Sequence, residues 1–155
     1  MAEESALAEF KHGIKLLRDG HSADALEYFR HAAELEQQNP YYLSFLGVAI
    51  ARALRKWGAA VKFCETALNS KRSEAQLYLN LAEVYVSAGR RDDAVAVLDR
   101  GLIHFKADAR IRRARADLGK RAFLVLPFLE RDHFLNRSLG KLRHRVFGRP
   151  RKSNS

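Results

Sequence analysis

Cysteine is nearly absent from this sequence. Cys64 is the single cysteine among 155 residues, so an internal disulfide and a metal site built from several cysteines are both excluded. No histidine lies between residues 40 and 74 that could activate its thiol, and buried thiols are inert. We therefore interpret Cys64 as a small apolar residue of the core.

Proline and long apolar runs are scarce as well. The sequence has 3 prolines, which makes helix the expected secondary structure. No run approaches the roughly 20 apolar residues that a membrane-spanning helix needs. The acidic N-terminus, MAEESALAEF, has no apolar core of the secretory kind. These absences predict a cytoplasmic protein. A peripheral location at the inner face of a membrane is a further possibility, because the C-terminal part of the chain is strongly basic.

The motifs of common active sites are also missing. There is no glycine-rich phosphate loop, no HExxH and no GxSxG. The 6 histidines do not pair at a metal-ligand spacing on one helical face. Asp132 and His133 are adjacent in sequence, so they would not face each other on a helix. We therefore expect no enzyme, no catalytic residue, no cofactor, no metal and no small-molecule substrate.

Positive charge is confined to one part of the chain. Residues 1–109 hold 14 Lys and Arg against 15 Asp and Glu, a net charge of −1. Residues 110–155 hold the other 14 Lys and Arg against 3 Asp and Glu, a net charge of +11. The two parts are therefore expected to differ in their contacts.

A repeated pattern of small and large residues runs through the near-neutral part. Ala75 to Leu102 predicts two antiparallel helices joined near Gly89, because apolar residues recur at helical spacing on either side of it. Two earlier stretches repeat the pattern at a period of 34 or 35 residues, which is typical of a helical-hairpin solenoid. The equivalent positions are Gly13, Gly47 and Ala82; Ala25, Ala60 and Ala94; Ala32, Ala67 and Gly101; and Phe29, Cys64 and Leu98.

The third copy resembles a tetratricopeptide repeat. The resemblance implies an all-α solenoid of helical hairpins, with repeats over residues 6–39, 40–74 and 75–107 after a disordered N-terminus at residues 1–5. The first copy departs from the family pattern, because Glu9 and His12 stand where an aromatic residue and a leucine are expected. The residues that carry the resemblance are Tyr78, Leu81, Ala82, Tyr85, Gly89, Ala94, Leu98 and Gly101.

The resemblance also implies a peptide-binding groove, which the first helices of successive repeats would line. The apolar side chains there suit a hydrophobic or amphipathic segment of another protein. A two-carboxylate clamp of Lys, Asn and Arg, which some chaperone-binding members use, is missing, since Phe10, Ile14, Phe45 and Gln76 stand at its places. That absence argues against an acidic C-terminal peptide as ligand. The predicted lining residues are Leu7, Phe10, Ile14, Leu17, Tyr41, Ser44, Val48, Arg52, Gln76, Leu79, Glu83 and Val86.

The C-terminal third continues the pattern and then departs from it. Residues 108–121 predict a capping helix with one narrow apolar stripe. Residues 122–148 predict an apolar segment, Ala122 to Leu129, followed by a basic amphipathic helix, and residues 149–155 a disordered tail. The apolar segment would be extra core, a docking patch, or a ligand for the chain's own groove.

Two functions from different classes follow from these patterns. The first is a protein-interaction scaffold, an adaptor or chaperone-like module that binds another protein in the groove. The alternative is an anchor in the basic C-terminal third that contacts an anionic membrane or nucleic acid. This anchor could also hold the protein within a larger assembly. A solubilising basic face is a third reading of the same charges. The anchor residues would be Arg112, Arg113, Arg115, Arg137, Lys141 and Arg145.

Overall fold

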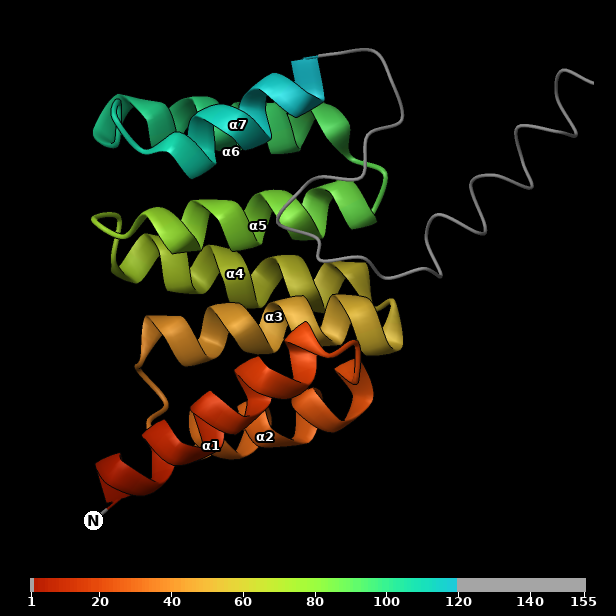
Figure 1. The fold of residues 1–155 in the computed structure, drawn as a ribbon, viewed down its shortest axis with the longest axis vertical. Helices are drawn as coiled ribbons and strands as arrows, with labels where there is room; N and C mark the ends of the chain where they lie inside the picture. Colours follow the sequence, from red (N-terminus) through yellow and green to blue (C-terminus); the bar gives the residue numbers. More distant parts are fainter. Residues whose placement is uncertain (1, 120–155) are drawn as a thin grey trace, which may run out of the picture.

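The computed structural model describes residues 2–119, and this part is built of seven α-helices and no strands (Figure 1). Successive helices pair into three antiparallel hairpins that stack in chain order, and a single helix packs against the last of them. The predicted all-α solenoid is thereby confirmed. The helices are α1 (Ala2–Arg18), α2 (Ser22–Leu35), α3 (Pro40–Leu54), α4 (Trp57–Ser70), α5 (Ala75–Ser87), α6 (Arg91–His104) and α7 (Ala109–Gly119).

The start of the first helix differs from the expected boundary. We expected residues 1–5 to be disordered, but α1 begins at Ala2. The reason is local, because Glu3 and Glu4 lie in the first turn, where negative charge interacts favourably with the helix dipole. At the other end α7 lies where the capping helix was predicted. The predicted segments at residues 122–148 and 149–155 fall outside the described residues.

The turns inside the hairpins share one backbone conformation. Gly20 and Gly89 have φ of 86° and 76°, a left-handed conformation that glycine adopts without a side-chain clash. Arg55 holds the equivalent place in the second hairpin with φ of 55°. The left-handed conformation costs free energy in a residue with a side chain. The packing of the second hairpin therefore holds Arg55 in a backbone conformation that arginine disfavours.

The core is built from the small and large residues that recur with the repeat. Phe29 of α2 lies against Gly13 of α1, where an added Cβ would stand only 2.8 Å from the ring. In the second hairpin Cys64 lies against Gly47, at 2.6 Å from a Cβ built there. Phe29, Cys64 and Leu98 are all fully buried. The first two hairpins therefore close by placing a large or medium side chain over a glycine.

Gly47→Ala tests this close approach. The added methyl group would also stand 2.8 Å from the carbonyl oxygen of Ala60, which is backbone and cannot rotate away. We expect the free energy of unfolding to fall by about 1–3 kcal/mol, measured by urea denaturation followed by circular dichroism. The control is Gly58→Ala in α4, where a Cβ meets nothing within 4 Å. Because alanine is the better helix former, equal losses in both variants would contradict the packing.

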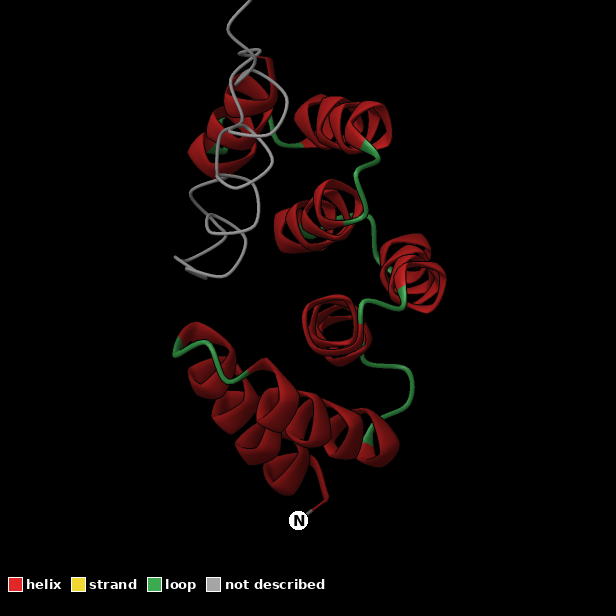
Figure 2. Ribbon diagram, turned by 90° about the vertical axis from the view of Figure 1, so that its right-hand side faces the viewer, coloured by secondary structure: helices red, strands yellow, loops and turns green. Residues whose placement is uncertain are grey.

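The first hairpin is inclined to the rest of the stack. Figure 2 shows the helices of the later hairpins nearly end-on, whereas the two lowest helices cross the view at an angle. α3 packs directly on α2, α4 and α5, while α1 reaches α3 mainly through aromatic side chains. The ring of Phe10 lies 4.9 Å from that of Tyr42 and 5.3 Å from that of Phe45, between ring centroids. An aromatic cluster thus fills the wedge between the first two hairpins.

No helix between Ala2 and Gly119 combines the length and the hydrophobicity that crossing a membrane requires.

Candidate functional site

The candidate site is the inner groove, which we define as the surface formed by α1, α3 and α5 at the twelve predicted lining positions. Seven of these side chains are accessible or half-buried: Leu7, Phe10, Ile14, Tyr41, Arg52, Gln76 and Val86. The other five are buried: Leu17, Ser44, Val48, Leu79 and Glu83. The structure corrects the prediction for those five, because neighbouring helices pack closely at their positions and leave them little surface to offer a ligand.

One end of the inner groove is apolar. Leu7 of α1 is 43% exposed, although it is a large aliphatic side chain. Phe10 and Ile14 follow it on the same helix at a spacing of three and four residues and are half-buried. These apolar side chains lie next to the aromatic cluster, and a ligand that covers them lowers the free energy by removing apolar surface from water.

The other end of the inner groove is polar. There a series of hydrogen bonds between side chains links α7, α5 and α3. Arg110 of α7 donates to Gln76 of α5 through Nη1 at 3.1 Å, and Gln76 donates to Asn80 at 2.8 Å. Asn80 in turn donates to the hydroxyl of Ser44 in α3 at 2.9 Å, and both of these groups are buried. The chain of bonds ties the first helices together at the floor of the groove.

Tyr41 belongs to the same polar end. Its hydroxyl donates to the carboxylate of Glu74, which also pairs with Lys71 at 3.0 Å. The hydrogen bond to Glu74, helped by burial, raises the pKa of Tyr41 to about 12. The same bond holds the pKa of the Glu74 carboxyl below its usual range. Tyr41 therefore stays a neutral donor at physiological pH.

Two predicted lining residues form an ion pair between α3 and α5. Nη2 and Nε of Arg52 each lie 2.7 Å from a carboxylate oxygen of Glu83, and the two side chains are only 10% and 7% exposed. Nη1 of Arg52 also donates to the carbonyl oxygen of Leu17, near the end of α1, at 3.4 Å. Together the ion pair and the bond to Leu17 join all three first helices toward their C-terminal ends.

The polar partners were not singled out from the sequence. Glu74, Asn80 and Arg110 are missing from the predicted site. A signal was available, because the bonded pairs lie about one repeat apart: 33 residues for Tyr41 and Glu74, 36 for Ser44 and Asn80, and 34 for Gln76 and Arg110.

The predicted basic surface is only partly within the described residues. Arg112 and Arg113 of α7 are exposed, whereas Nε of Arg115 lies 2.6 Å from the carboxylate of Asp99 in α6. Arg115 thus joins two helices. The remaining anchor positions, Arg137, Lys141 and Arg145, lie outside the described residues, so the anchor stays a prediction.

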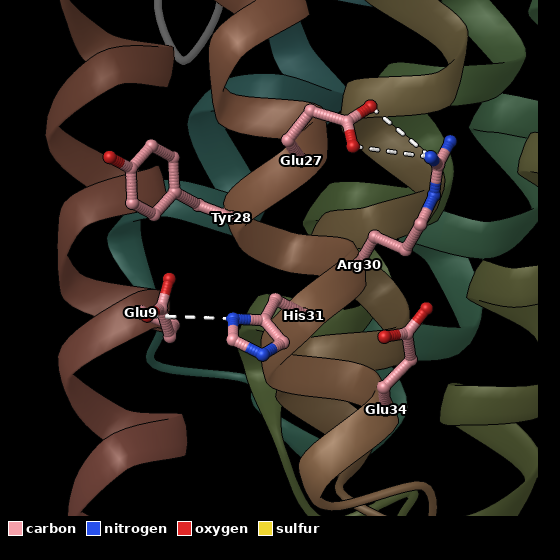
Figure 3. A pocket seen from close by; sticks show the side chains of 6 residues that line it. All are labelled: Glu9, Glu27, Tyr28, Arg30, His31 and Glu34. Atoms are coloured by element: carbon pink, nitrogen blue, oxygen red, sulfur yellow. Dashed lines mark hydrogen bonds and ion pairs between the residues drawn. The ribbon is translucent and has the colours of Figure 1, made fainter.

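A second hollow lies between α1 and α2, with a volume of about 380 Å³ (Figure 3). Glu9 points from α1 toward His31 of α2, and the carboxylate lies 3.5 Å from Nδ1. Arg30 and Glu27 pair along α2 at 3.2 Å. Three carboxylates, those of Glu9, Glu27 and Glu34, thus face one guanidinium in the hollow, and the hollow was not predicted from the sequence. Its lining residues are Glu9, Glu27, Tyr28, Arg30, His31 and Glu34.

The chemistry at Cys64 is that of a core residue. Its thiol is fully buried and donates to the carbonyl oxygen of Ser44 at 3.3 Å. Burial raises the pKa of the Cys64 thiol well above its usual range, so the reactive thiolate is not formed at physiological pH. Within residues 2–119, no three His, Cys, Asp or Glu side chains gather closely enough to hold a metal ion.

Comparisons with known proteins agree with this architecture. A family model described as tetratricopeptide repeat matches residues 51–118, and no curated protein matches the chain. The first tetratricopeptide domain of Spaghetti (RPAP3), bound to the HSP90 peptide SRMEEVD, is a similar solved structure. Its TM-score is 0.64 at 18% identity, over 76% of this chain and 95% of that one.

Two further solved structures are similar. One is the second tetratricopeptide domain of human RPAP3 in complex with the HSP70 peptide SGPTIEEVD, with a TM-score of 0.64 at 15% identity over 78% of this chain and 100% of that one. The other is an O-GlcNAc transferase mutant from Thermobaculum terrenum, with a TM-score of 0.68 at 18% identity over 92% of this chain and 27% of that one. At these identities the likeness concerns the fold alone.

Proposed function

Because this chain belongs to the tetratricopeptide repeat family, we propose that it is a non-enzymatic interaction module that binds a segment of another protein in its inner groove. The module would act as an adaptor or a chaperone-like protein. Two of the similar solved structures are complexes with peptides of other proteins, which supports a protein as the partner.

The observation that carries the proposal is the apolar end of the groove. Leu7 is 43% exposed in a helix whose neighbouring apolar side chains, Phe10 and Ile14, already pack against the hydrophobic core. An amphipathic peptide that lays its apolar face on these three side chains buries them without any large rearrangement. A hydrophobic or amphipathic segment is therefore the ligand that this end suits.

The residues at the clamp positions also support a hydrophobic or amphipathic ligand. Phe10 and Ile14 stand where a two-carboxylate clamp would need polar or basic side chains, and both are half-buried among apolar neighbours. The amide of Gln76 is already engaged by Asn80 and Arg110. An acidic peptide would therefore find no pair of cations at these positions.

Leu7→Glu is the direct test. We expect a peptide selected by the full chain from a random library of short synthetic peptides to bind this variant at least about tenfold more weakly, because a charged group in an apolar contact must lose water without compensation. The measurement is isothermal titration calorimetry with the same peptide.

The matched control is Ile103→Glu. Ile103 lies on α6, outside the groove, and is 68% exposed, so the same charge is introduced on an aliphatic side chain of the surface. We expect its dissociation constant to stay at the wild-type value. Equal binding by the wild type, Leu7→Glu and Ile103→Glu would contradict the groove proposal.

A further inference from the structure

The chain leaves the described structure beside the inner groove. Arg110 in the first turn of α7 donates to Gln76 in the first turn of α5, so α7 continues the row of helices that line the groove. These helices run in the same direction, from left to right in Figure 1, and their last turns lie on one side of the stack. Gly119, at the end of α7, therefore lies on the same side of the stack as Leu17 and Arg52, near the ends of α1 and α3.

A strongly apolar run of residues follows Gly119. After Lys120 and Arg121, the eight residues of Ala122–Leu129 read AFLVLPFL and contain no charged or hydrogen-bonding side chain. Pro127 has no backbone N–H and disfavours helix at the residue before it, so the sequence predicts an extended run. Removing its six large apolar side chains from water lowers the free energy. The run therefore needs an apolar surface to cover it.

The length of this run matches the width of the inner groove. Leu129 lies ten residues beyond Gly119, and an extended chain covers at most about 33–36 Å over that length. Neighbouring helices pack at up to about 10 Å between their axes, so the three steps from α7 to α1 need about 30 Å. The run is therefore long enough to cross α5 and α3 and to bring its last residues to Ile14 on α1.

Half-buried apolar side chains lie along this path. Val86 lies near the end of α5, and Phe10 and Ile14 lie on α1. Each packs against the hydrophobic core with one part of its surface and leaves another part accessible. Between them the guanidinium of Arg52 is paired with the carboxylate of Glu83, so the floor of the groove offers no unpaired charge to an apolar ligand at this point.

The charges on either side of the run favour one direction across the groove. Residues 1–39, which form the first hairpin, carry 8 Asp and Glu against 4 Lys and Arg, a net charge of −4. Residues 130–155, which follow the run, carry 8 Lys and Arg against 2 Asp and Glu, a net charge of +6. A run that crosses to α1 brings these basic residues to the acidic hairpin. A run that stayed at α7 would leave them beside a helix of net charge +3, where like charges repel.

We propose that Ala122–Leu129 occupies the inner groove of its own chain when no partner is bound, and that it crosses from the end of α7 to α1. The inference goes beyond the proposed function, although it rests on the same groove. A segment tied to the solenoid by two residues has an effective concentration in about the millimolar range, so a partner peptide must displace it. The affinity for that peptide is then reduced by the fraction of chains whose groove is open.

A spin label attached at Glu130→Cys tests the position of the run in the full chain. Glu130 follows the run directly, and the thiol of Cys64 is fully buried, so the reagent modifies the introduced cysteine. Two isoleucines form a matched pair, because Ile14 lines the groove at α1 and Ile103 is 68% exposed on α6, outside it. In a methyl NMR spectrum we expect Ile14 to lose most of its intensity, relative to the reduced label, and Ile103 to keep its intensity.

Leu126→Glu places a charge inside the run and is expected to release it from the groove. The Ile14 signal should then recover, and the selected peptide should bind about tenfold more tightly, as for a groove that was open in about one chain of ten. Leu139→Glu, the same change ten residues beyond the run, is the control and should alter neither result. The signals of the buried Ile50 and Ile111 report in the same spectrum that the solenoid stays folded.

The outcomes separate this inference from the proposed function. An Ile14 signal that keeps its intensity, or that stays weak in Leu126→Glu, refutes occupation of the groove by the run. If Leu7→Glu weakens peptide binding while the Ile14 signal is unaffected by the label, the proposed function stands and the inference is wrong. If the label weakens the Ile14 signal but Leu7→Glu binds the peptide like the wild type, the run occupies the groove and the proposed function is wrong.

A mixed sample tests whether the run lies in the groove of a second copy. It combines a spin-labelled chain without isotopes and an isotope-labelled chain without a spin label. We expect the Ile14 signal to keep its intensity in this mixture, because the contact is within one chain. An equal loss of Ile14 intensity in the mixture would assign the run to the groove of another copy and overturn the proposal.

Discussion

Replacing Phe29 with alanine is expected to lower the free energy of unfolding by about 3–5 kcal/mol. The side chain is fully buried, and its ring centroid lies 5.6 Å from that of Phe10 and 5.7 Å from that of Phe45. It also covers Gly13, which has no side chain to fill the space that would be left. The cavity therefore opens where α1, α2 and α3 meet, and urea denaturation measures the loss.

Tyr28→Ala is the control for Phe29→Ala. Tyr28 precedes Phe29 in α2, so the change in helix propensity is nearly the same. Its ring is half-buried and stacks on the ring of His12 at 4.4 Å, near the surface. We expect a loss of about 1 kcal/mol for this variant. Similar losses in the two variants would show that the aromatic cluster does not hold the first hairpin.

The packing inside each hairpin could be predicted from the sequence because it depends on residue volume at a fixed period. Gly13 with Phe29 and Gly47 with Cys64 lie in one hairpin each, so their partners are set by a short turn and by helical geometry. A large side chain requires a small one opposite it. Equivalent positions therefore predict contacts even before the superhelix is known.

The incline of the first hairpin could not be predicted in this way. It depends on how Phe10 fills the wedge between α1 and α3, with its ring against both Tyr42 and Phe45. In the later hairpins α3 and α5 pack directly on each other. The sequence shows aromatic residues at these places, but the angle at which three rings pack is a property of the assembled structure.

The character of the groove was only half predictable. The apolar end at Leu7 and Phe10 follows from the family pattern, since those side chains lie on the inner face of the first repeat. The polar end depends on pairs such as Gln76 and Arg110, whose side chains meet only because α5 and α7 are stacked in register. A single position in the sequence does not indicate such a pair. Two polar residues that lie one repeat apart do indicate one.

The second large effect on stability is expected from breaking the ion pair of Arg52 and Glu83. We expect Glu83→Leu to lower the free energy of unfolding by about 3–5 kcal/mol, because the guanidinium of Arg52 would stay buried without its carboxylate. Arg52→Met, which leaves the carboxylate behind, should cost a similar amount. The two side chains are 10% and 7% exposed and their atoms approach to 2.7 Å, so water cannot easily replace either partner.

The double variant separates the ion pair from the packing around it. Arg52→Met combined with Glu83→Leu removes both charges, so most of the stability should return, and the coupling energy from the four proteins measures the pair. Arg30→Met is the control, because Arg30 and Glu27 form an exposed pair, with side chains 49% and 66% accessible. Its expected change is below about 0.5 kcal/mol. A double variant as unstable as the sum of the single ones would show that Arg52 and Glu83 stabilise the groove independently, and that their contact does not join α3 to α5.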